Sequence, residues 1–152
     1  MIFFKEREML RFVERLNDLI SEKDVTPQQI KATIGVDVYH RKSEKNEYTP
    51  LLPDFIKLAN YFECSLGYLA GLEEQTEKYS FKTELPPFGE RLRFIIKQKG
   101  ISVKKLAQEA HLSGTIVIYQ WFSGKYFPRV GNLIELSKAL DCSLDYLVGR
   151  EK

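Results

Sequence analysis

The sequence predicts an all-α protein made of two tandem five-helix domains, and three observations support this prediction. First, the phrase C-S-L-x-Y-L-x-G begins at Cys64 and again at Cys142, 78 residues later. Second, the likeness continues upstream, because residues 12–16 (FVERL) parallel residues 88–92 (FGERL) at an offset of 76. Third, apolar residues recur at helical spacing, and no stretch favours a β-strand. A period this long that occurs twice is typical of tandem domains.

The repeat divides the chain into two domains and a connecting segment. We expect the first domain at residues 1–72, a linker at residues 73–87 and the second domain at residues 88–152. The second copy is longer by two residues in its middle, because the offset between matching positions rises from 76 to 78. The linker is acidic, yet it holds Tyr79 and Phe81, which indicates that it packs against a domain.

Helix one is predicted from about Lys5 to Glu22 in the first domain and from Phe88 to Lys99 in the second. The first of these helices has one apolar face with helical spacing, formed by Met9, Phe12, Leu16, Leu19 and Ile20. The second is expected to end at Gly100, because glycine readily adopts the left-handed conformation that stops a helix.

Helix two follows a capping residue in both domains. Thr26 and Ser102 are of the type that accepts hydrogen bonds from the first backbone N–H groups of a helix, and Pro27 suits the first helical position. We expect helix two to end near Gly35 in the first domain and near His111 in the second, where the chain turns with positive φ.

A third helix follows in each domain, and in the second domain it is expected over residues 113–121. There Ile116, Val117 and Ile118 are adjacent β-branched apolar residues, which cannot all face one core because a helix turns about 100° per residue. One of them is expected to face outward. Trp121 is interpreted as a core anchor rather than as a residue that stacks on bases.

Helices four and five close each domain. Helix four is expected to begin near Pro53 and near Val130. Helix five is the repeated phrase itself, and its ends are set by two capping serines and two terminal glycines, namely Ser65, Ser143, Gly71 and Gly149. In this interpretation the phrase occurs twice because the whole domain occurs twice.

Composition excludes several classes of protein. Hydrophobic residues make up 43% of the chain and charged residues 29%, which is ordinary for a globular protein and argues against disorder. No apolar run approaches the ~18 residues that a membrane span needs, so no membrane partner is expected. The opening apolar cluster of MIFF is too short for a signal peptide, and a cytoplasmic location is therefore expected.

Neither a metal site, nor a cofactor site, nor a catalytic site is indicated. Cys64 and Cys142 occupy the same place in the repeated phrase and are interpreted as small buried side chains without a disulfide. The chain has no C-x-x-C motif, and His40 and His111 are its only histidines, which are too few ligands for zinc. His111 lies near Ser113 without an orienting acid, and no glycine-rich phosphate loop is present, so we do not expect an enzyme.

The net charge is +2, but it is uneven along the chain. Residues 88–152 carry 11 lysines and arginines against 6 acidic residues, a net charge of +5. Residues 1–72 carry 10 against 11, a net charge of −1. If one domain binds a polyanion such as nucleic acid, the second domain is the better candidate.

A series of short motifs runs through residues 88–149. These are Glu90-Arg91-Leu92-Arg93, Gly100-Ile101-Ser102, Lys105-Leu106-Ala107, Leu112-Ser113, Trp121-Phe122-Ser123-Gly124-Lys125, Pro128, residues 133–140 (LIELSKAL) and residues 143–149 (SLDYLVG). In this order and spacing the second domain resembles the lambda-repressor/Cro-like helix-turn-helix family, also called the xenobiotic-response-element (XRE) family. The resemblance implies a sequence-specific transcriptional regulator, bacterial or phage in style, whose third helix enters the major groove of double-stranded DNA.

The resemblance also implies roles for individual residues of the second domain. Four residues at and after the start of helix three are candidates for reading base edges: Ser113, Thr115, Tyr119 and Gln120. Five residues near the start of helix two and after helix three are candidates for holding phosphates: Ser102, Lys104, Lys105, Lys125 and Arg129.

The first domain departs from the family pattern where DNA would be read. Its Trp-x-x-Gly-Lys segment is missing, so it is a divergent copy. Tyr39 and His40 are nevertheless candidates for reading bases, and Arg41 and Lys42 for holding phosphates. Two interpretations stay open for this domain: a second DNA reader, or a degenerate copy kept for packing or dimerisation.

Two functions of different classes remain. In the first, the chain binds double-stranded DNA as a homodimer, or as an intramolecular pseudo-dimer whose two domains read half-sites about 34 Å apart. In the second, it is a non-catalytic protein-interaction regulator, antirepressor-like or a dimerisation module, that retains the fold without specific DNA binding. The apolar run in helix three and the acidic first domain motivate the second function.

Overall fold

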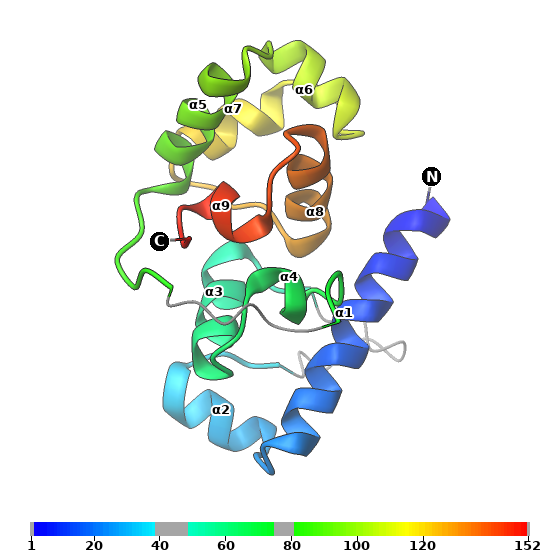
Figure 1. Cartoon of the computed structure of the whole chain (residues 1–152), viewed down its shortest axis with the longest axis vertical. Coiled ribbons are helices and arrows are strands. Elements are labelled where there is room, and N and C mark those ends of the chain that lie inside the picture. Colours follow the sequence, from blue (N-terminus) through cyan, green and yellow to red (C-terminus); the bar gives the residue numbers. More distant parts are fainter. Residues whose placement is uncertain (1, 39–48, 75–80, 152) are drawn as a thin grey trace. The chain divides into compact units, whose positions relative to one another are not determined.

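The computed structural model describes residues 2–38, 49–74 and 81–151 (Figure 1). Within these ranges the chain forms nine helices and no β-strand, which confirms the predicted all-α class. The chain divides into two compact units, Met1–Glu77 and Lys78–Lys152.

The first unit has four helices in its described residues. They are α1 (Ile2–Glu22), α2 (Pro27–Ile34), α3 (Leu52–Tyr61) and α4 (Leu66–Leu69). α1 begins three residues before the predicted Lys5, because no glycine or proline precedes that residue to break the helix. The third helix predicted for this unit falls on a stretch whose residues 39–48 lie outside the described part of the chain.

The core of the first unit forms where α1, α3 and α4 meet. The rings of Phe12 in α1 and Phe55 in α3 pack edge to face with centroids 5.9 Å apart, and both side chains are fully buried. Just beyond α4, Gly71 has a φ of +81°, and a Cβ atom there would lie 2.8 Å from the Cβ of Arg11. Glycine therefore allows the end of α4 to approach α1 closely.

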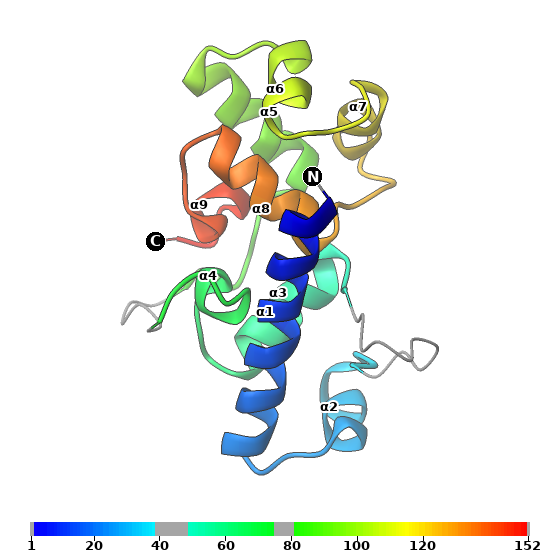
Figure 2. The ribbon, with the colours of Figure 1, turned by 90° about the vertical axis from the view of Figure 1, so that its right-hand side faces the viewer.

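The described residues of the second unit form five helices, as predicted for this domain. They are α5 (Phe88–Lys99), α6 (Val103–Glu109), α7 (Ile116–Phe122), α8 (Val130–Ala139) and α9 (Leu144–Val148). α5 packs against α7 and α9, while α8 packs against α6 and α9 (Figures 1 and 2). The core side chains are fully buried aliphatic residues from all five helices, among them Leu92, Leu106, Ile118, Leu133 and Leu147.

The predicted helix ends are confirmed at most positions. Thr26 and Ser102 cap α2 and α6 by accepting the backbone N–H groups of Gln29 and Lys105. The turn after α2 has Gly35 at φ +75°, and the turn after α6 has His111 at φ +58°. A histidine therefore takes the left-handed conformation that glycine takes in the first unit.

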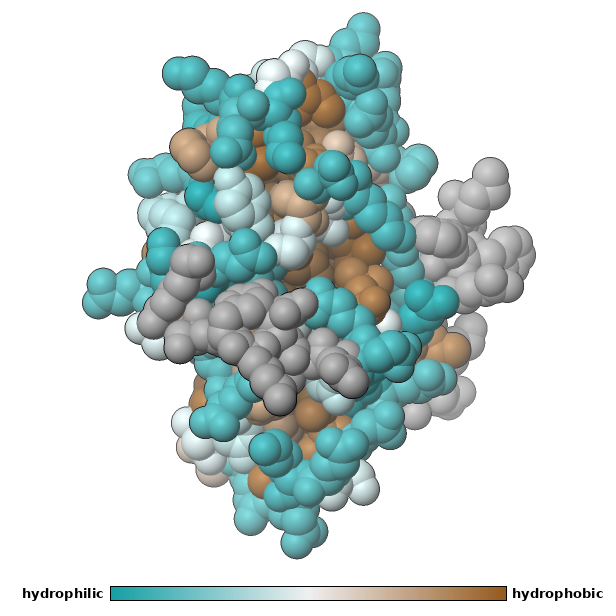
Figure 3. Space-filling view, in the orientation of Figure 1, coloured by the Kyte–Doolittle hydropathy of each residue, from teal (hydrophilic) through white to brown (hydrophobic). Residues whose placement is uncertain are grey.

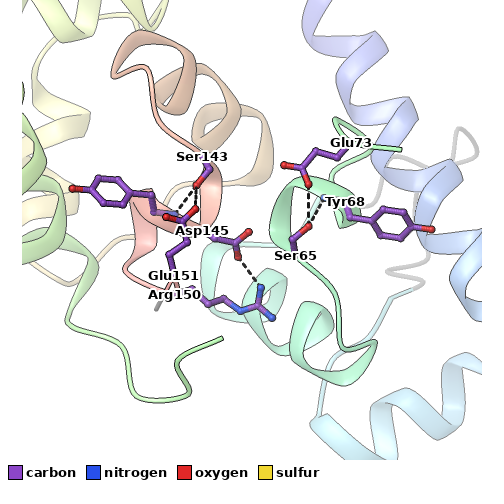
Figure 4. A network of polar contacts seen from close by, with 8 residues as sticks. Ser65, Tyr68, Glu73, Ser143, Asp145, Arg150 and Glu151 are labelled. Carbon is purple, nitrogen blue, oxygen red and sulfur yellow. Dashed lines mark hydrogen bonds and ion pairs between the residues drawn. The ribbon is translucent and has the colours of Figure 1, made fainter. Parts of the chain in front are cut away.

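The repeated phrase makes the same contacts in both units (Figure 4). Ser65 caps α4 through the N–H of Tyr68, and Ser143 caps α9 through the N–H of Tyr146. Each of these serines also donates its hydroxyl to a glutamate eight residues later, Glu73 at 3.2 Å in the first unit and Glu151 at 2.7 Å in the second.

An arginine of helix one completes this arrangement in each unit. Arg15 donates to the carbonyl oxygen of Tyr68 at 2.6 Å, and Arg91 donates to that of Tyr146 at 2.7 Å. Each guanidinium also lies over the ring of the same tyrosine, 3.9 and 4.6 Å from the ring centroid. Two segments more than fifty residues apart in sequence are joined in this way in each unit.

The predicted linker is partly incorporated into the second unit. The Phe81 ring lies under the Arg150 guanidinium at 3.9 Å, and the Lys82 N–H donates to the Arg150 carbonyl oxygen at 2.9 Å. The guanidinium in turn contacts Asp145 at 2.7 Å. The expectation that Phe81 packs against a domain is confirmed, whereas Tyr79 lies outside the described residues.

Trp121 and Cys64 are buried as expected, whereas Cys142 is not fully buried. Trp121 is 2% exposed, so it is a core residue. Cys64 is buried, but Cys142 is only partly buried, and neither cysteine forms a disulfide. Hydrophilic residues cover most of the visible outer surface of each unit, with smaller hydrophobic patches between them (Figure 3).

Candidate nucleic-acid interface

The second unit contains two short helices, α6 and α7, joined by a tight turn over residues 110–115. The N–H of Leu112 donates to the carbonyl oxygen of Ala107 at 2.9 Å, which reverses the chain immediately after α6. The expectation that no acid orients His111 is wrong, because its Nδ1 lies 3.0 Å from Oε2 of Glu135, a nearly buried carboxylate of α8. The turn is therefore attached to the core of the unit.

α7 begins later than predicted. The expected start was Ser113, but the first helical residue is Ile116, so residues 113–115 form the turn instead. Gly114 favours this outcome because glycine is a poor helix former. Thr115 is the N-cap residue, and its carbonyl oxygen accepts the N–H groups of Ile118 and Tyr119.

α7 has one buried face and one exposed face. Ile118 is fully buried, and Trp121 is 2% exposed. On the opposite side Ile116 is 74% exposed and Tyr119 is 56% exposed, and Gln120 is exposed beside them. The expectation that one of the three adjacent β-branched residues faces outward is confirmed, and that residue is Ile116.

The structure brings some of the predicted base-reading residues together. Tyr119 and Gln120 are exposed neighbours on α7, Ser113 is exposed in the preceding turn, and Thr115 is half-buried at the start of the helix. Only two of these four side chains are therefore presented by the helix itself. The four candidates of the first domain, Tyr39, His40, Arg41 and Lys42, lie outside the described residues.

The five predicted phosphate-holding residues of the second domain are all exposed. Ser102 uses its hydroxyl oxygen as the cap of α6, which leaves the hydroxyl hydrogen available as a donor. Lys104 follows it on the helix. Lys105 lies 3.8 Å from Glu109, but both side chains are well exposed, so this ion pair is weak. Lys125 and Arg129 lie in the segment after α7.

α5 supports α7 through a close approach that the sequence analysis missed. A Cβ atom at Gly89 would lie 2.6 Å from the carbonyl oxygen of Phe122. The guanidinium carbon of Arg93 lies 4.4 Å from the centroid of the Phe122 ring, and the Tyr119 ring packs edge to face on Phe122 at 5.6 Å. Arg93 and Phe122 are 29 residues apart in sequence, so no local pattern indicates their contact.

The start of α2 in the first unit differs from the start of α6. Gln29 accepts the N–H of Thr26 at 2.8 Å and donates its own N–H to the Thr26 hydroxyl at 3.1 Å, which completes a capping box. Pro27 at the first helical position has no N–H group. The first turn of α2 therefore offers fewer backbone donors to a phosphate than an ordinary helix start.

Other kinds of site find no support in the described ranges. No group of three or more His, Cys, Asp or Glu side chains there is arranged to hold a metal ion. Burial raises the pKa of the Cys142 thiol to about 11, so this thiol stays protonated and unreactive near neutral pH. In the same part of the chain no helix combines the length and the apolarity needed to cross a membrane.

Comparison with known proteins identifies the second unit. Residues 92–147 match the family model described as helix-turn-helix, so this segment is a helix-turn-helix domain. The match starts within α5 and ends within α9.

One solved structure is also similar to the chain. It is the crystal structure of the P22 c2 repressor protein in complex with synthetic operator 9T in the presence of Tl⁺. The two sequences are 38% identical over 43% of this chain and 96% of that chain, with a TM-score of 0.38. No curated protein matches the chain.

Proposed function

We propose that this chain is a sequence-specific regulator of transcription that binds double-stranded DNA by placing α7 in the major groove. The exposed face of α7 carries the proposal, because it presents Ile116, Tyr119 and Gln120 while the opposite face anchors the helix in the core. The match of residues 92–147 to the helix-turn-helix family supports the same function. A major groove about 12 Å wide accepts a helix of this kind.

The chemistry of this face suits base edges. The amide of Gln120 is able to accept from and donate to one adenine at the same time. Ile116 offers an apolar surface to the methyl group of a thymine. The hydroxyl of Tyr119 donates or accepts a hydrogen bond with a base or a phosphate. Lysines on both sides of α7 in the chain, Lys104 and Lys125 among them, then neutralise phosphates along the groove.

We further propose that the two units are diverged copies of one domain. Shared contacts support this proposal, because Ser65 and Ser143 cap equivalent helices and Arg15 and Arg91 hold equivalent carbonyl oxygens. The closed capping box at the start of α2 argues that the first unit holds phosphates less well than the second. A chain that uses both units, alone or as a homodimer, would therefore read an asymmetric site. Such a bacterial or phage regulator acts in the cytoplasm, where its DNA lies.

A second function is favoured by one observation. Among its described residues the second unit has five large exposed apolar side chains, on α5, on α7 and in the segment after α7, and they are Phe94, Ile116, Tyr119, Tyr126 and Phe127. A surface of this composition also suits a protein partner. In that case the chain is a non-catalytic interaction regulator, and α7 is covered by protein rather than by DNA.

Selection from a random pool of double-stranded DNA by the intact chain at ~0.15 M salt tests the proposal. Sequence-specific binding enriches a motif, and its affinity falls steeply with salt because counterions are released. Gln120→Ala relaxes the preference at one base pair, whereas the control Gln108→Ala, an exposed glutamine of α6, does not. A folded chain that enriches no sequence contradicts the proposal and favours the interaction regulator.

The form of the enriched motif reports on the first unit. Two spaced, unequal elements indicate that both units read DNA. One short element assigns the reading to the second unit alone and leaves the first unit a role in packing or dimerisation.

A further inference from the structure

The two arginines of α5, Arg91 and Arg93, make different contacts. Arg91 directs its Nε and Nη2 donors to the carbonyl oxygen of Tyr146 at 3.1 and 2.7 Å, so it joins α5 to α9. Arg93 is exposed and lies over the Phe122 ring with its guanidinium carbon 4.4 Å from the centroid. Among the described residues, no carboxylate forms an ion pair with Arg93.

Stacking on a ring leaves a guanidinium able to bind an anion. When a ring lies against the flat face of the group, the five N–H donors stay in the plane and point outward. This fork fits two oxygens of a phosphate, and the stack reduces the freedom that is lost on binding. Phe122 therefore holds the cation in position without using its donors.

Arg93 lies close to the residues of α7 that would face the major groove. The guanidinium carbon of Arg93 and the ring of Tyr119 both lie on Phe122, at 4.4 and 5.6 Å from its centroid, so they are at most 10 Å apart. The major groove is about 12 Å wide, and its two walls are lined by phosphates. When Tyr119 faces the groove, a phosphate of the nearer wall is within reach of Arg93.

We infer that Arg93 is a further phosphate-binding residue of the interface, held by its stack on Phe122, so that α5 as well as α6 and α7 contacts the DNA backbone. This inference rests on the proposed function. It assigns to Arg93 a contact with the backbone, which adds affinity for any sequence, and not a contact with a base.

The salt dependence of DNA binding tests the inference. The affinities of the intact chain, Arg93→Met and Arg93→Lys are measured at several salt concentrations for the selected DNA site and for a random-sequence duplex. Lys99→Met is the matched control, because it removes one positive charge from the same helix and its ammonium is directed to the carbonyl oxygen of Asp141. Trp121 fluorescence verifies that each variant is folded.

We expect Arg93→Met to weaken binding to both duplexes by the same factor, about tenfold near 0.1 M salt. The slope of log K against log[salt] then becomes shallower by about 0.9, the value for one lost phosphate contact. Arg93→Lys keeps most of the slope but binds less tightly, because an ammonium lacks the planar fork. Lys99→Met leaves the slope unchanged.

Three results overturn the inference. If Arg93→Met behaves like Lys99→Met while the intact chain binds DNA with a steep slope, the inference fails and the proposed function stands. If Arg93→Met weakens binding to the selected site alone, Arg93 acts on base reading and does not hold the backbone. If the folded intact chain binds neither duplex, the inference and the proposed function fail together.

Discussion

Replacing Gly89 by alanine places a methyl group between α5 and α7. The new Cβ atom would lie 2.6 Å from the carbonyl oxygen of Phe122, 2.7 Å from that of Trp121 and 2.9 Å from Cα of Phe122. All three atoms belong to the backbone, so no side chain is able to rotate away. The helices have to separate by about 0.8 Å before the shortest of these distances reaches 3.4 Å, the start of ordinary contact.

The cost of this separation follows from known effects. Overpacking of a well-packed site costs about 1–3 kcal/mol of the free energy of unfolding. Alanine recovers up to about 1 kcal/mol, because it is a better helix former than glycine. We expect a net loss of about 1–2 kcal/mol. For a domain of this size the melting temperature then falls by roughly 5–15 °C.

Urea and thermal unfolding followed by Trp121 fluorescence measure the change. Trp121 is the chain's single tryptophan and is buried in the second unit, so its signal reports on that unit. Gly114→Ala is the control, because a Cβ atom at Gly114 would meet nothing within 4 Å. An unchanged or raised stability of Gly89→Ala, together with a neutral control, would refute the close approach of α5 to α7.

Three further predictions concern the caps, the interface and the thiols. Ser143→Ala removes the cap of α9 on the Tyr146 N–H and should lower the free energy of unfolding by about 1 kcal/mol in urea titrations, and no change would show that the cap is dispensable. Lys125→Met should weaken binding to all DNA sequences alike and make the salt slope shallower by about 0.9, which salt titration of a selected and a random duplex measures. Because burial raises the pKa of Cys142 to about 11, only about one thiol in a thousand is ionised at pH 8. Alkylation of this thiol should therefore be far slower than that of a free cysteine and should accelerate as the pH rises, whereas fast labelling of a folded Cys64→Ser chain at pH 8 would contradict this.

The sequence by itself determined the local features of the fold. The capping serines, the left-handed turn at His111 and the end of α5 before Gly100 were all predictable. The reason is that these features depend on hydrogen bonds and backbone angles within three or four residues. The repeat was likewise visible without a structure, and the apolar spacing and the capping residues predicted the five helices of the second unit.

The sequence analysis placed the start of α7 wrongly, because residues 113–115 form part of a tight turn instead of the first turn of the helix. Ser113 to Thr115 resemble the beginning of a helix, but glycine at position 114 and the tight turn after His111 keep them out of it. The pattern of three β-branched residues predicted that one faces outward, but it did not show which. Burial of Ile118 and Trp121 in the core decided that Ile116 is exposed.

Only the tertiary structure decided which distant residues meet. Arg93 lies on Phe122 because Gly89 lets α5 approach α7, and Phe81 joins the second unit because its ring lies under Arg150. Such contacts join segments separated by tens of residues, and they depend on the packing of whole helices rather than on any local pattern. The sequence thus determined the helices and their ends, while packing determined the surface that they present.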